Sequence, residues 1–436
     1  MRWLFILLIG VLAAGDILGK DMSLGPGLSP KNAVLYMIAL AMFFRLSLTG
    51  NQPRARLPML QAAFAVWIAY ATLSFVSCCL IIHYTSYDIK DSGILLKAQL
   101  YDAALFCFTV FYGVENEADF KALARVLVAA IGLSSIFTLT DVVGVTHLGA
   151  KVGTTGAEAD RVFGMFGHAN ETGALLVCML PAMGAVAMAS RGPARLWWYA
   201  CAFTTLTVLV LTVSRGSYVA VVVGYGAAAF MCRRYLPLSK VAAWAAMCAT
   251  GVIVLVALVS AVVPNVGEVV VGRMLGQSGA IDITEVSSGR TNIWANTLDH
   301  MMDEPLTFLT GFGWNVYDTR FVYATHNYYL DLLFNLGLIG LLAFVAILFQ
   351  AVKTARAAVD LASEEMRPYM IALVFGIVGL GVNIMFTNLS KAWPYIWLYM
   401  GMTLSAGAKI IADTVQRREA TAPALTVAST VVRGAR

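Results

Sequence analysis

Charged residues are scarce in this chain of 436 residues. Asp, Glu, Lys and Arg make up 13% of the sequence and hydrophobic residues 59%. Soluble globular proteins carry roughly 25% charged residues, which cover their water-exposed surface. The composition therefore excludes a set of water-soluble domains of this total length. It indicates an integral membrane protein instead.

Several sequence patterns of known chemistry are also missing. The sequence has no P-loop, no GxSxG and no HExxH motif, and it lacks the Asp-x-Asp pair that is typical of metal-dependent glycosyl transfer. Its seven cysteines lie in or at the edges of apolar runs, so we expect neither a disulfide framework nor a metal cluster. No metal and no other cofactor is predicted.

Apolar runs of the length that a membrane-spanning helix needs, about 20 residues, recur along the chain. The twelve candidates are residues 3–19, 32–49, 58–82, 94–113, 123–146, 171–190, 196–213, 217–232, 241–263, 331–352, 369–388 and 394–412. We interpret the first as an uncleaved span, with a cleaved signal peptide after Arg2 as the alternative. The sequence predicts an all-α membrane protein with about twelve transmembrane helices.

The distribution of Lys and Arg predicts the orientation of these spans. Most of the 30 basic residues fall on the inner side if the N-terminus is inside, which favours an N-in, C-in topology. The predicted transmembrane domain is 1–413, followed by a disordered cytoplasmic tail, 414–436. Two outer segments are long, 147–170 and 264–330. We expect the second, larger one to contain short helices.

A capped amphipathic helix is predicted within the larger outer segment. It would begin after Ser287-Ser288-Gly289 and place one stripe of residues toward protein or membrane, namely Arg290, Trp294, Thr297 and Met301. The opposite face would carry Asn292, Asn296 and Asp299. An Arg on the less polar stripe is expected to face protein or membrane rather than open solvent.

Good N-cap residues precede three spans that begin on the outer side: Asn170, Ser214 and Asn327. Helix N-termini attract anions, and Arg binds phosphate through two parallel contacts. Arg161 and Arg215 lie close to two of these helix starts, and Arg290 opens the amphipathic helix. The sequence predicts a binding site for a lipid-linked diphosphate on the outer face.

Each arginine also has a structural interpretation. Arg215 would serve as an anchor at the membrane interface, and Arg161 would pair with Glu158 or Asp160. Arg290 would pair with Glu285 within the loop. We favour the functional interpretation, because interface anchors usually gather on the cytoplasmic side and Arg215 sits in a very short outer turn.

Five histidines are present, and His326 is the candidate general base. Neutral imidazole accepts a hydroxyl proton near pH 7, and His326 stands beside a predicted cap, Asn327. His168 precedes Asn170 and is expected to orient that turn. The remaining three are interpreted as structural: His83, His147 and His300.

At these residues the sequence resembles the O-antigen ligases and the related O-antigen polymerases of bacterial envelopes. The motifs are Arg161 with FGMFGHAN, Ser214-Arg215-Gly216, Ser288-Gly289-Arg290 with Trp294, Gly311-Phe312-Gly313-Trp314 and His326-Asn327. Each is weak alone, but their order and common side make the combination fairly specific. One departure is Ala169, where the family often has Pro.

The resemblance implies a metal-independent, inverting glycosyltransferase of the GT-C type in the bacterial inner membrane. It would transfer polysaccharide from undecaprenyl diphosphate to a sugar hydroxyl of lipid A–core on the periplasmic side. By this resemblance Arg215 and Arg290 would hold the diphosphate, Arg161 would support them, and His326 would activate the acceptor. The expected partners are these two lipid-linked substrates and membrane lipid, with no nucleic acid.

Three alternatives remain at this point. An O-antigen polymerase would use the same donor chemistry with a second lipid-linked glycan as acceptor. A protein O-oligosaccharyltransferase usually extends further past the last span. A transporter of lipid-linked glycan would place its ionisable groups near the bilayer midplane in repeated halves, whereas the residues singled out here lie at outer ends.

Overall fold

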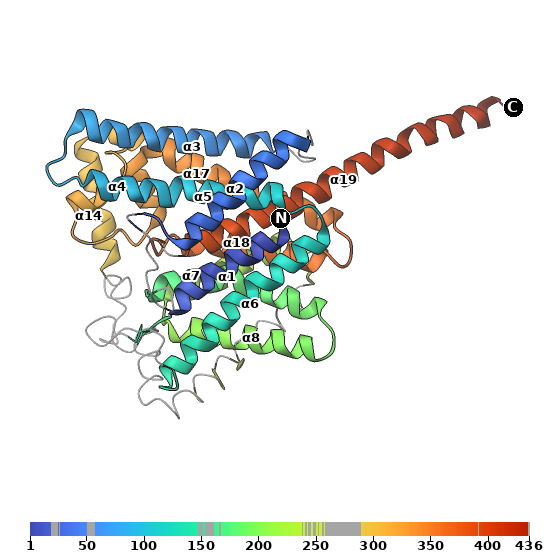
Figure 1. Cartoon of the computed structure of the whole chain (residues 1–436), viewed down its shortest axis with the longest axis horizontal. Coiled ribbons are helices and arrows are strands. Elements are labelled where there is room, and N and C mark those ends of the chain that lie inside the picture. Colours follow the sequence, from blue (N-terminus) through green and yellow to red (C-terminus); the bar gives the residue numbers. More distant parts are fainter. Residues whose placement is uncertain are drawn as a thin grey trace.

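The computed structural model describes residues 1–18, 27–49, 57–146, 161–164, 167–237, 289–390 and 392–434, with residues 25 and 151–152 and single positions between 239 and 257. Within these ranges the chain is mainly helical, as predicted, and many of its long helices run in similar directions (Figure 1). One departure from an all-α fold is a small antiparallel pair, β1 (Lys151–Val152) with β2 (Val162–Gly164).

The described part of the first half of the chain forms helices, most of them long. They are α1 (Arg2–Leu18), α2 (Pro30–Thr49), α3 (Pro58–Ser77), α4 (Ile89–Leu96), α5 (Asp102–Gly113), α6 (Glu117–Val142), α7 (Ala169–Ala189) and α8 (Gly192–Leu211). Two π-helical turns continue or join them, η1 (Cys78–Ile82) and η2 (Lys97–Tyr101).

The second half combines short and long helices. They are α9 (Arg215–Val219), the π-helical turn η4 (Ala220–Gly224), α10 (Tyr225–Met231), α14 (Arg290–Asp303), α15 (Thr307–Thr310), α16 (Tyr317–Arg320), α17 (Tyr328–Leu361), α18 (Arg367–Asn383) and α19 (Trp393–Gly434). The described part of residues 264–330 contains the short helices α14, α15 and α16, and its location on the outer side stays a prediction.

Seven of the described helices are long and apolar enough to cross a membrane. They cover Pro30–Leu48, Pro58–Ile82, Ile89–Gly113, Glu117–Val142, Ala169–Ala189, Gly192–Leu211 and Tyr328–Leu361. Arg367–Asn383 is a shorter apolar helix. These helices indicate a multi-pass membrane protein. The number twelve stays a prediction, and the predicted span 241–263 lies largely outside the described residues.

Ion pairs gather at the helix ends that we predicted to face the cytoplasm. They join Arg2 to Asp119 at 3.6 Å, Lys121 to Glu365 at 2.8 Å, Arg356 to Asp360 at 2.8 Å, and Arg45 to Glu115. The Arg45 contact lowers the pKa of the Glu115 carboxyl and keeps it ionised. The predicted outer segments contact one another at the other end of these helices, which we call the site end.

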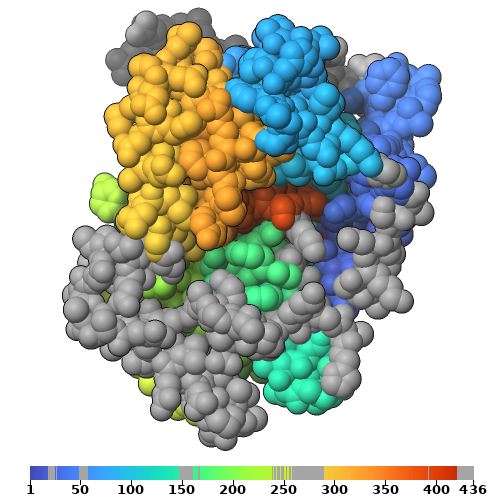
Figure 2. Space-filling model, turned by 90° about the vertical axis from the view of Figure 1, so that its left-hand side faces the viewer, coloured from blue at the N-terminus to red at the C-terminus, as the bar shows by residue number. Residues whose placement is uncertain are grey.

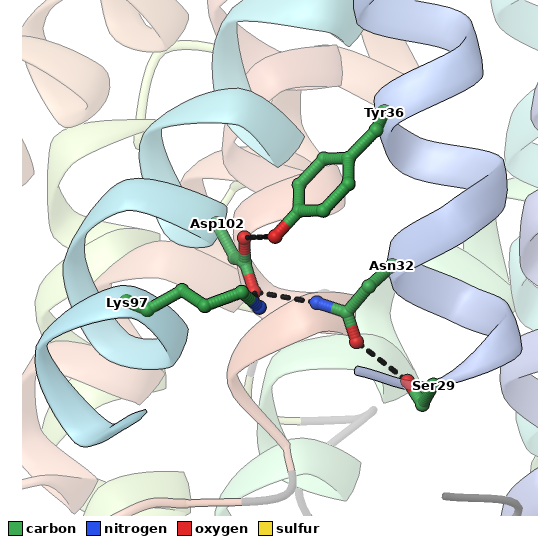
Figure 3. Close-up of polar contacts among 5 residues, drawn as sticks. All are labelled: Ser29, Asn32, Tyr36, Lys97 and Asp102. Carbon is green, nitrogen blue, oxygen red and sulfur yellow. Dashed lines mark hydrogen bonds and ion pairs between the residues drawn. The ribbon is translucent and has the colours of Figure 1, made fainter. Parts of the chain in front are cut away.

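A buried carboxylate ties α2 to α5 (Figure 3). Asp102 accepts hydrogen bonds from Asn32 Nδ2 at 2.6 Å, Tyr36 Oη at 2.7 Å and Lys97 Nζ at 2.8 Å. Ser29 donates in turn to Asn32 at 2.5 Å. A carboxylate in apolar surroundings is tolerated when its charge is paired and its oxygens are hydrogen-bonded, and both conditions are met here.

Helix α17 turns back on itself. Gly337 has φ 60° and ψ −167°, which interrupts the helix. The rings of Tyr328 and Phe344 are 5.1 Å apart between centroids, although residues 16 positions apart in a continuous helix are separated by about 24 Å. Residues 328–336 therefore form an arm that folds back beside the helix that follows. The predicted single span 331–352 is wrong in this respect, because LGLIGLL has the apolar content of an ordinary helix.

The Gly311-Phe312-Gly313-Trp314 motif docks on the end of this arm. The amides of Phe312 and Gly313 donate to the carbonyls of Phe334 and Asn335 at 2.9 and 3.0 Å. The break at Gly337 removes these carbonyls from the regular helical pattern, and the motif satisfies them. Its contribution in the structure is thus to fix the end of the arm.

Two tyrosines from the connection between η1 and α4 hold the same motif from the other side. Tyr84 donates to the Phe312 carbonyl at 2.6 Å and Tyr87 to the Trp314 carbonyl at 2.8 Å. Burial raises the pKa of both phenols, so both stay protonated donors at neutral pH. The outer segment is thereby fastened to the first half of the chain.

The C-terminal segment differs from the sequence-based expectation. We predicted a disordered tail from residue 414, but the backbone of α19 continues as a helix to Gly434 (Figure 1). Gln416, Arg417, Arg418, Glu419 and Ala420 are good helix formers, which explains the first turns of this continuation. Its cytoplasmic location stays a prediction.

Candidate active site at the site end

Arg161 is buried between two helix starts. Its side chain is 4% exposed, Nε donates to the Thr212 carbonyl at 3.0 Å, and Nη2 donates to Asn170 Oδ1 at 2.7 Å. These bonds fasten the start of α7 to the turn that carries Ser214 and Arg215. The geometry suits the supporting role expected for Arg161 better than a direct two-point contact with a ligand.

His168 and His326 come together from distant parts of the chain. Their ring centroids are 6.4 Å apart with an interplanar angle of 23°. His168 is the N-cap residue of α7, and His326 immediately precedes the cap of the α17 arm. Two residues that the sequence singled out for separate reasons thus face one another at the site end.

The backbone at His326 is held in a left-handed conformation with φ 48°. The two neighbouring residues support this conformation. Thr325, which is fully buried, has its Oγ1 within 3.3 Å of the Asn327 amide, which donates to it. Trp294 Nε1 donates to the Thr325 carbonyl at 2.8 Å. The predicted supporting residue Trp294 therefore acts on the residue next to the candidate base.

A second support comes from the connection between α18 and α19, which sequence reasoning missed. Thr325 Oγ1 donates to Asn388 Oδ1 at 3.1 Å. Further along this connection, the amides of Ser390 and Ala392 each donate to Glu171 Oε1 at 2.7 Å. Glu171 is 4% exposed and stands one residue after Asn170. A carboxylate in the first turn of an apolar span was the available signal in the sequence.

The turn before Arg215 is tight and conformationally unusual. Val213 is buried and has φ 47°, which is rare for a β-branched residue. Ser214 is the N-cap residue of α9, as predicted, and its Oγ accepts from Ser217 Oγ at 3.0 Å. Arg215 is the first residue of α9 and is partly exposed. The Arg161 contact to Thr212 thus lies three residues from this guanidinium.

Close packing explains why α9 can approach α7 here. A Cβ atom at Gly173 would lie 2.3 Å from Ser217 Oγ, so only glycine fits at this crossing. Asn383 Nδ2 donates to the same Ser217 Oγ at 3.0 Å, which adds the end of α18 to the contact. The polar residues of α7, α9 and α18 therefore form one buried layer beneath the site.

Helix α14 shows the predicted two-sided pattern. Thr297 and Met301 are fully buried, Arg290 and Trp294 are partly buried, and the opposite face is exposed. The N-cap residue is Gly289, with φ 74° and no side-chain cap; Ser287 and Ser288 lie outside the described residues. Arg290 is one helical turn before Trp294 on the same stripe, so it faces the side of His326.

Two of the three predicted N-caps stand and one is wrong. Asn327 accepts from the amides of Tyr329 and Leu330 at 3.1 and 3.2 Å and caps the α17 arm. Asn170 is not a cap, because α7 begins at Ala169 and the N-cap position is His168. Asn170 lies within the first turn of α7 and uses its side chain to accept from Arg161.

These contacts surround a hollow at the site end. Figure 2 looks onto this face. The yellow and orange surfaces of α14 and α17 stand on one side and the light-blue segment that contains α4 on the other, and green α7 and red α19 are set back between them. The described contacts bring the buried Arg161 guanidinium, the start of α7 and the imidazoles of His168 and His326 into one region at the site end. Together they are suited to hold an anion and to accept a proton beside it.

Residues 200–345 match the model of a family described as O-antigen ligase. This segment of the chain is thus similar to O-antigen ligases. The resemblance inferred from the motifs is thereby confirmed. The matched O-antigen ligase segment contains Arg215, Arg290 and His326, whereas Arg161 and His168 precede it and Asn388 follows it. No individual curated protein matches the chain.

Proposed function

We propose that the protein is an O-antigen ligase: a metal-independent, inverting glycosyltransferase of the GT-C type in the bacterial inner membrane. It would transfer polysaccharide from undecaprenyl diphosphate to a sugar hydroxyl of lipid A–core on the periplasmic face. The single observation that carries this proposal is the meeting of His168 and His326 beside the Arg161–Thr212 contact, in a chain with an O-antigen ligase domain.

The proposed chemistry assigns one proton transfer and one bond exchange. His326 accepts the proton of the acceptor hydroxyl, and the resulting oxygen attacks the anomeric carbon of the donor sugar. The bond between that carbon and the diphosphate oxygen breaks, and the electron pair leaves with the diphosphate. Arg215 and Arg290 stabilise the negative charge that develops on it.

Arg161 and Trp294 have positioning roles in this scheme. Arg161 holds the turn of Arg215 through Thr212, and Trp294 holds Thr325 beside His326. Burial of Arg161 keeps its hydrogen bonds to Thr212 and Asn170 out of competition with water. In this scheme the two more exposed arginines, Arg215 and Arg290, bind the diphosphate.

Deletion of the gene tests the proposal, with the lipopolysaccharide then examined by gel electrophoresis. A ligase predicts loss of the whole ladder of capped molecules, with lipid-linked polysaccharide accumulating. An O-antigen polymerase, which would share the donor site, predicts short capped molecules that carry a single repeat. An unchanged ladder would contradict both assignments.

A further inference from the structure

The outward side of α14 is divided into two flanks of different character. Residues Asn292, Asn296, Asp299 and Asp303 form a polar flank, and all are exposed. Leu298 and Met302, one helical turn apart, lie together on the other flank and are 37% and 58% exposed. The inward stripe that packs on the protein is separate from both. The helix therefore has an apolar surface that the described protein does not cover.

This apolar flank continues into the next segment. Leu306 is 71% exposed and Leu309, in α15, is 49% exposed. We call Leu298, Met302, Leu306 and Leu309 the outer ridge. Four large apolar side chains over twelve positions, with only Glu304 and Asp303 as charges after Met302, are costly to leave in water.

The outer ridge adjoins the surface of α17 that faces lipid. Exposed Leu338, Leu342, Val345 and Phe349 recur on one face of this membrane-spanning helix. The backbone of Leu309 lies beside the start of this part of α17, since a Cβ atom on Gly337 would be 2.3 Å from the Leu309 carbonyl oxygen. Tyr70 of α3 also donates to the neighbouring Thr310 carbonyl at 2.6 Å. The exposed Leu306 and Leu309 are thus close in the fold to the end of α17 from which its exposed apolar face begins.

The direction of α14 agrees with this placement. In Figures 1 and 2 the yellow segment that contains α14 extends across the ends of α3 and α17 rather than along them. A helix that lies in the plane of a membrane interface has this orientation, with its apolar flank in the acyl region and its polar flank in water.

We propose that the outer ridge is a lipid-binding surface, immersed in the bilayer leaflet at the site end. Its occupant is the acyl-chain region of ordinary bilayer lipid. The ridge carries no Lys or Arg, so the association is with apolar chains rather than with anionic headgroups. This inference concerns a surface distinct from the candidate site and does not depend on the proposed reaction.

The immersed helix would also reach the candidate site. The inward stripe of α14 includes Trp294, whose indole holds the Thr325 carbonyl next to His326. One flank of the same helix therefore rests in lipid while another holds the backbone beside the candidate base. The depth of α14 in the leaflet would therefore determine how far Thr325 and His326 lie from the membrane.

Site-directed fluorescence tests the proposal on the full-length protein in lipid nanodiscs. Met302→Cys and the matched control Asn296→Cys are labelled with an environment-sensitive fluorophore, and unsubstituted protein gives the background of the native cysteines. Quenching is compared between nitroxide-labelled phospholipid and aqueous iodide. We expect lipid nitroxide to quench the label at 302 at least several-fold more strongly than the label at 296, and iodide to show the reverse order.

Two results would overturn the proposal. Equal quenching of both positions by iodide would place the outer ridge in water. Protection of position 302 from both quenchers would show that protein, such as a second copy of the chain, covers it. If Met302→Cys does not fold, Leu306→Cys provides the same measurement at a second position of the outer ridge. Stronger quenching by lipid nitroxide would support the proposal there, and quenching by iodide equal to that at position 296 would overturn it.

Discussion

Positive φ values at non-glycine residues mark two edges of the candidate site. Among the described residues they occur at His83, Val213, Asn315 and His326. Such a conformation costs about 1–3 kcal/mol and persists where surrounding contacts enforce it. Val213 is enforced by the Arg161 contact to Thr212, and His326 by the contacts of Thr325 and Asn327. In both cases the strained residue lies within two positions of a side chain expected to meet substrate.

Replacement of His326 by Ala should abolish transfer while the protein remains folded in the membrane. Loss of a general base typically lowers the rate by about 10²–10⁴-fold. His83→Ala is a matched control, because His83 also has φ 48° and its replacement imposes the same backbone cost. Turnover by purified variants with lipid-linked donor is the measurement. Equal activity of the two variants would remove His326 from the mechanism.

Arg215→Lys and Arg290→Lys should both be severely impaired. Lysine keeps the positive charge but loses the planar two-point contact with a diphosphate. Arg233→Lys is the control, because Arg233 lies after α10 at the opposite end, with its guanidinium 4.3 Å from the Phe230 ring centroid. The measurement is the transfer rate of each purified variant at saturating donor. If all three variants lose activity to the same degree, the arginines serve insertion or orientation instead.

Elements from three parts of the chain converge on Thr325, and this convergence can be tested. Thr325→Val removes the hydroxyl that joins Asn388 and the Asn327 amide, whereas Thr325→Ser keeps it. We expect the Val variant to lower kcat by roughly 10–100-fold with little change in KM, since small displacements of a base are costly. The Ser variant should retain most activity. A change in KM alone would assign Thr325 to substrate binding.

The turn in α17 makes a second prediction at the scale of an element. Gly337→Ala places a Cβ atom against the Leu309 carbonyl and imposes a left-handed conformation, so it should destabilise the protein by more than the ~1 kcal/mol of an ordinary strained residue. Gly184→Ala in α7 meets no atom within 4 Å and is the control. Thermal unfolding in detergent should show a lower midpoint for the first variant only.

Local signals allowed some elements to be predicted, and tertiary contacts decided the others. The stripe of α14 and the cap at Asn327 were predictable, because each depends on residues within one or two turns. The turn at Gly337 was not, because its cause is the approach of Leu309 and Gly311 from another segment. The same holds for Arg161, because its hydrogen bonds to the Thr212 carbonyl and to Asn170 depend on how α7 and the turn after α8 meet in space.

For the molecule as a whole, the proposed reaction should not require a divalent metal ion. The sequence lacks the outer Asp-x-Asp pair, and within the described ranges no three His, Cys, Asp or Glu side chains come together as a candidate metal site. We expect purified protein with lipid-linked donor and acceptor to remain active in excess EDTA, without a gain from magnesium or manganese. A clear requirement for either ion would contradict the arginine-based stabilisation of the leaving group.

Two contacts join the matched O-antigen ligase segment to the chain outside it, and they bear on how such proteins can be recombined. Arg161 to Thr212 and Thr325 to Asn388 each join a residue inside residues 200–345 to one outside. A chimera that exchanges only 200–345 with a relative would keep its proposed reactive groups and lose the matched partners that hold them. Chimeras that exchange 161–173 and 383–392 together with 200–345 should recover the activity that the shorter exchange loses. We therefore expect these two short segments to be needed in any exchange meant to change acceptor preference.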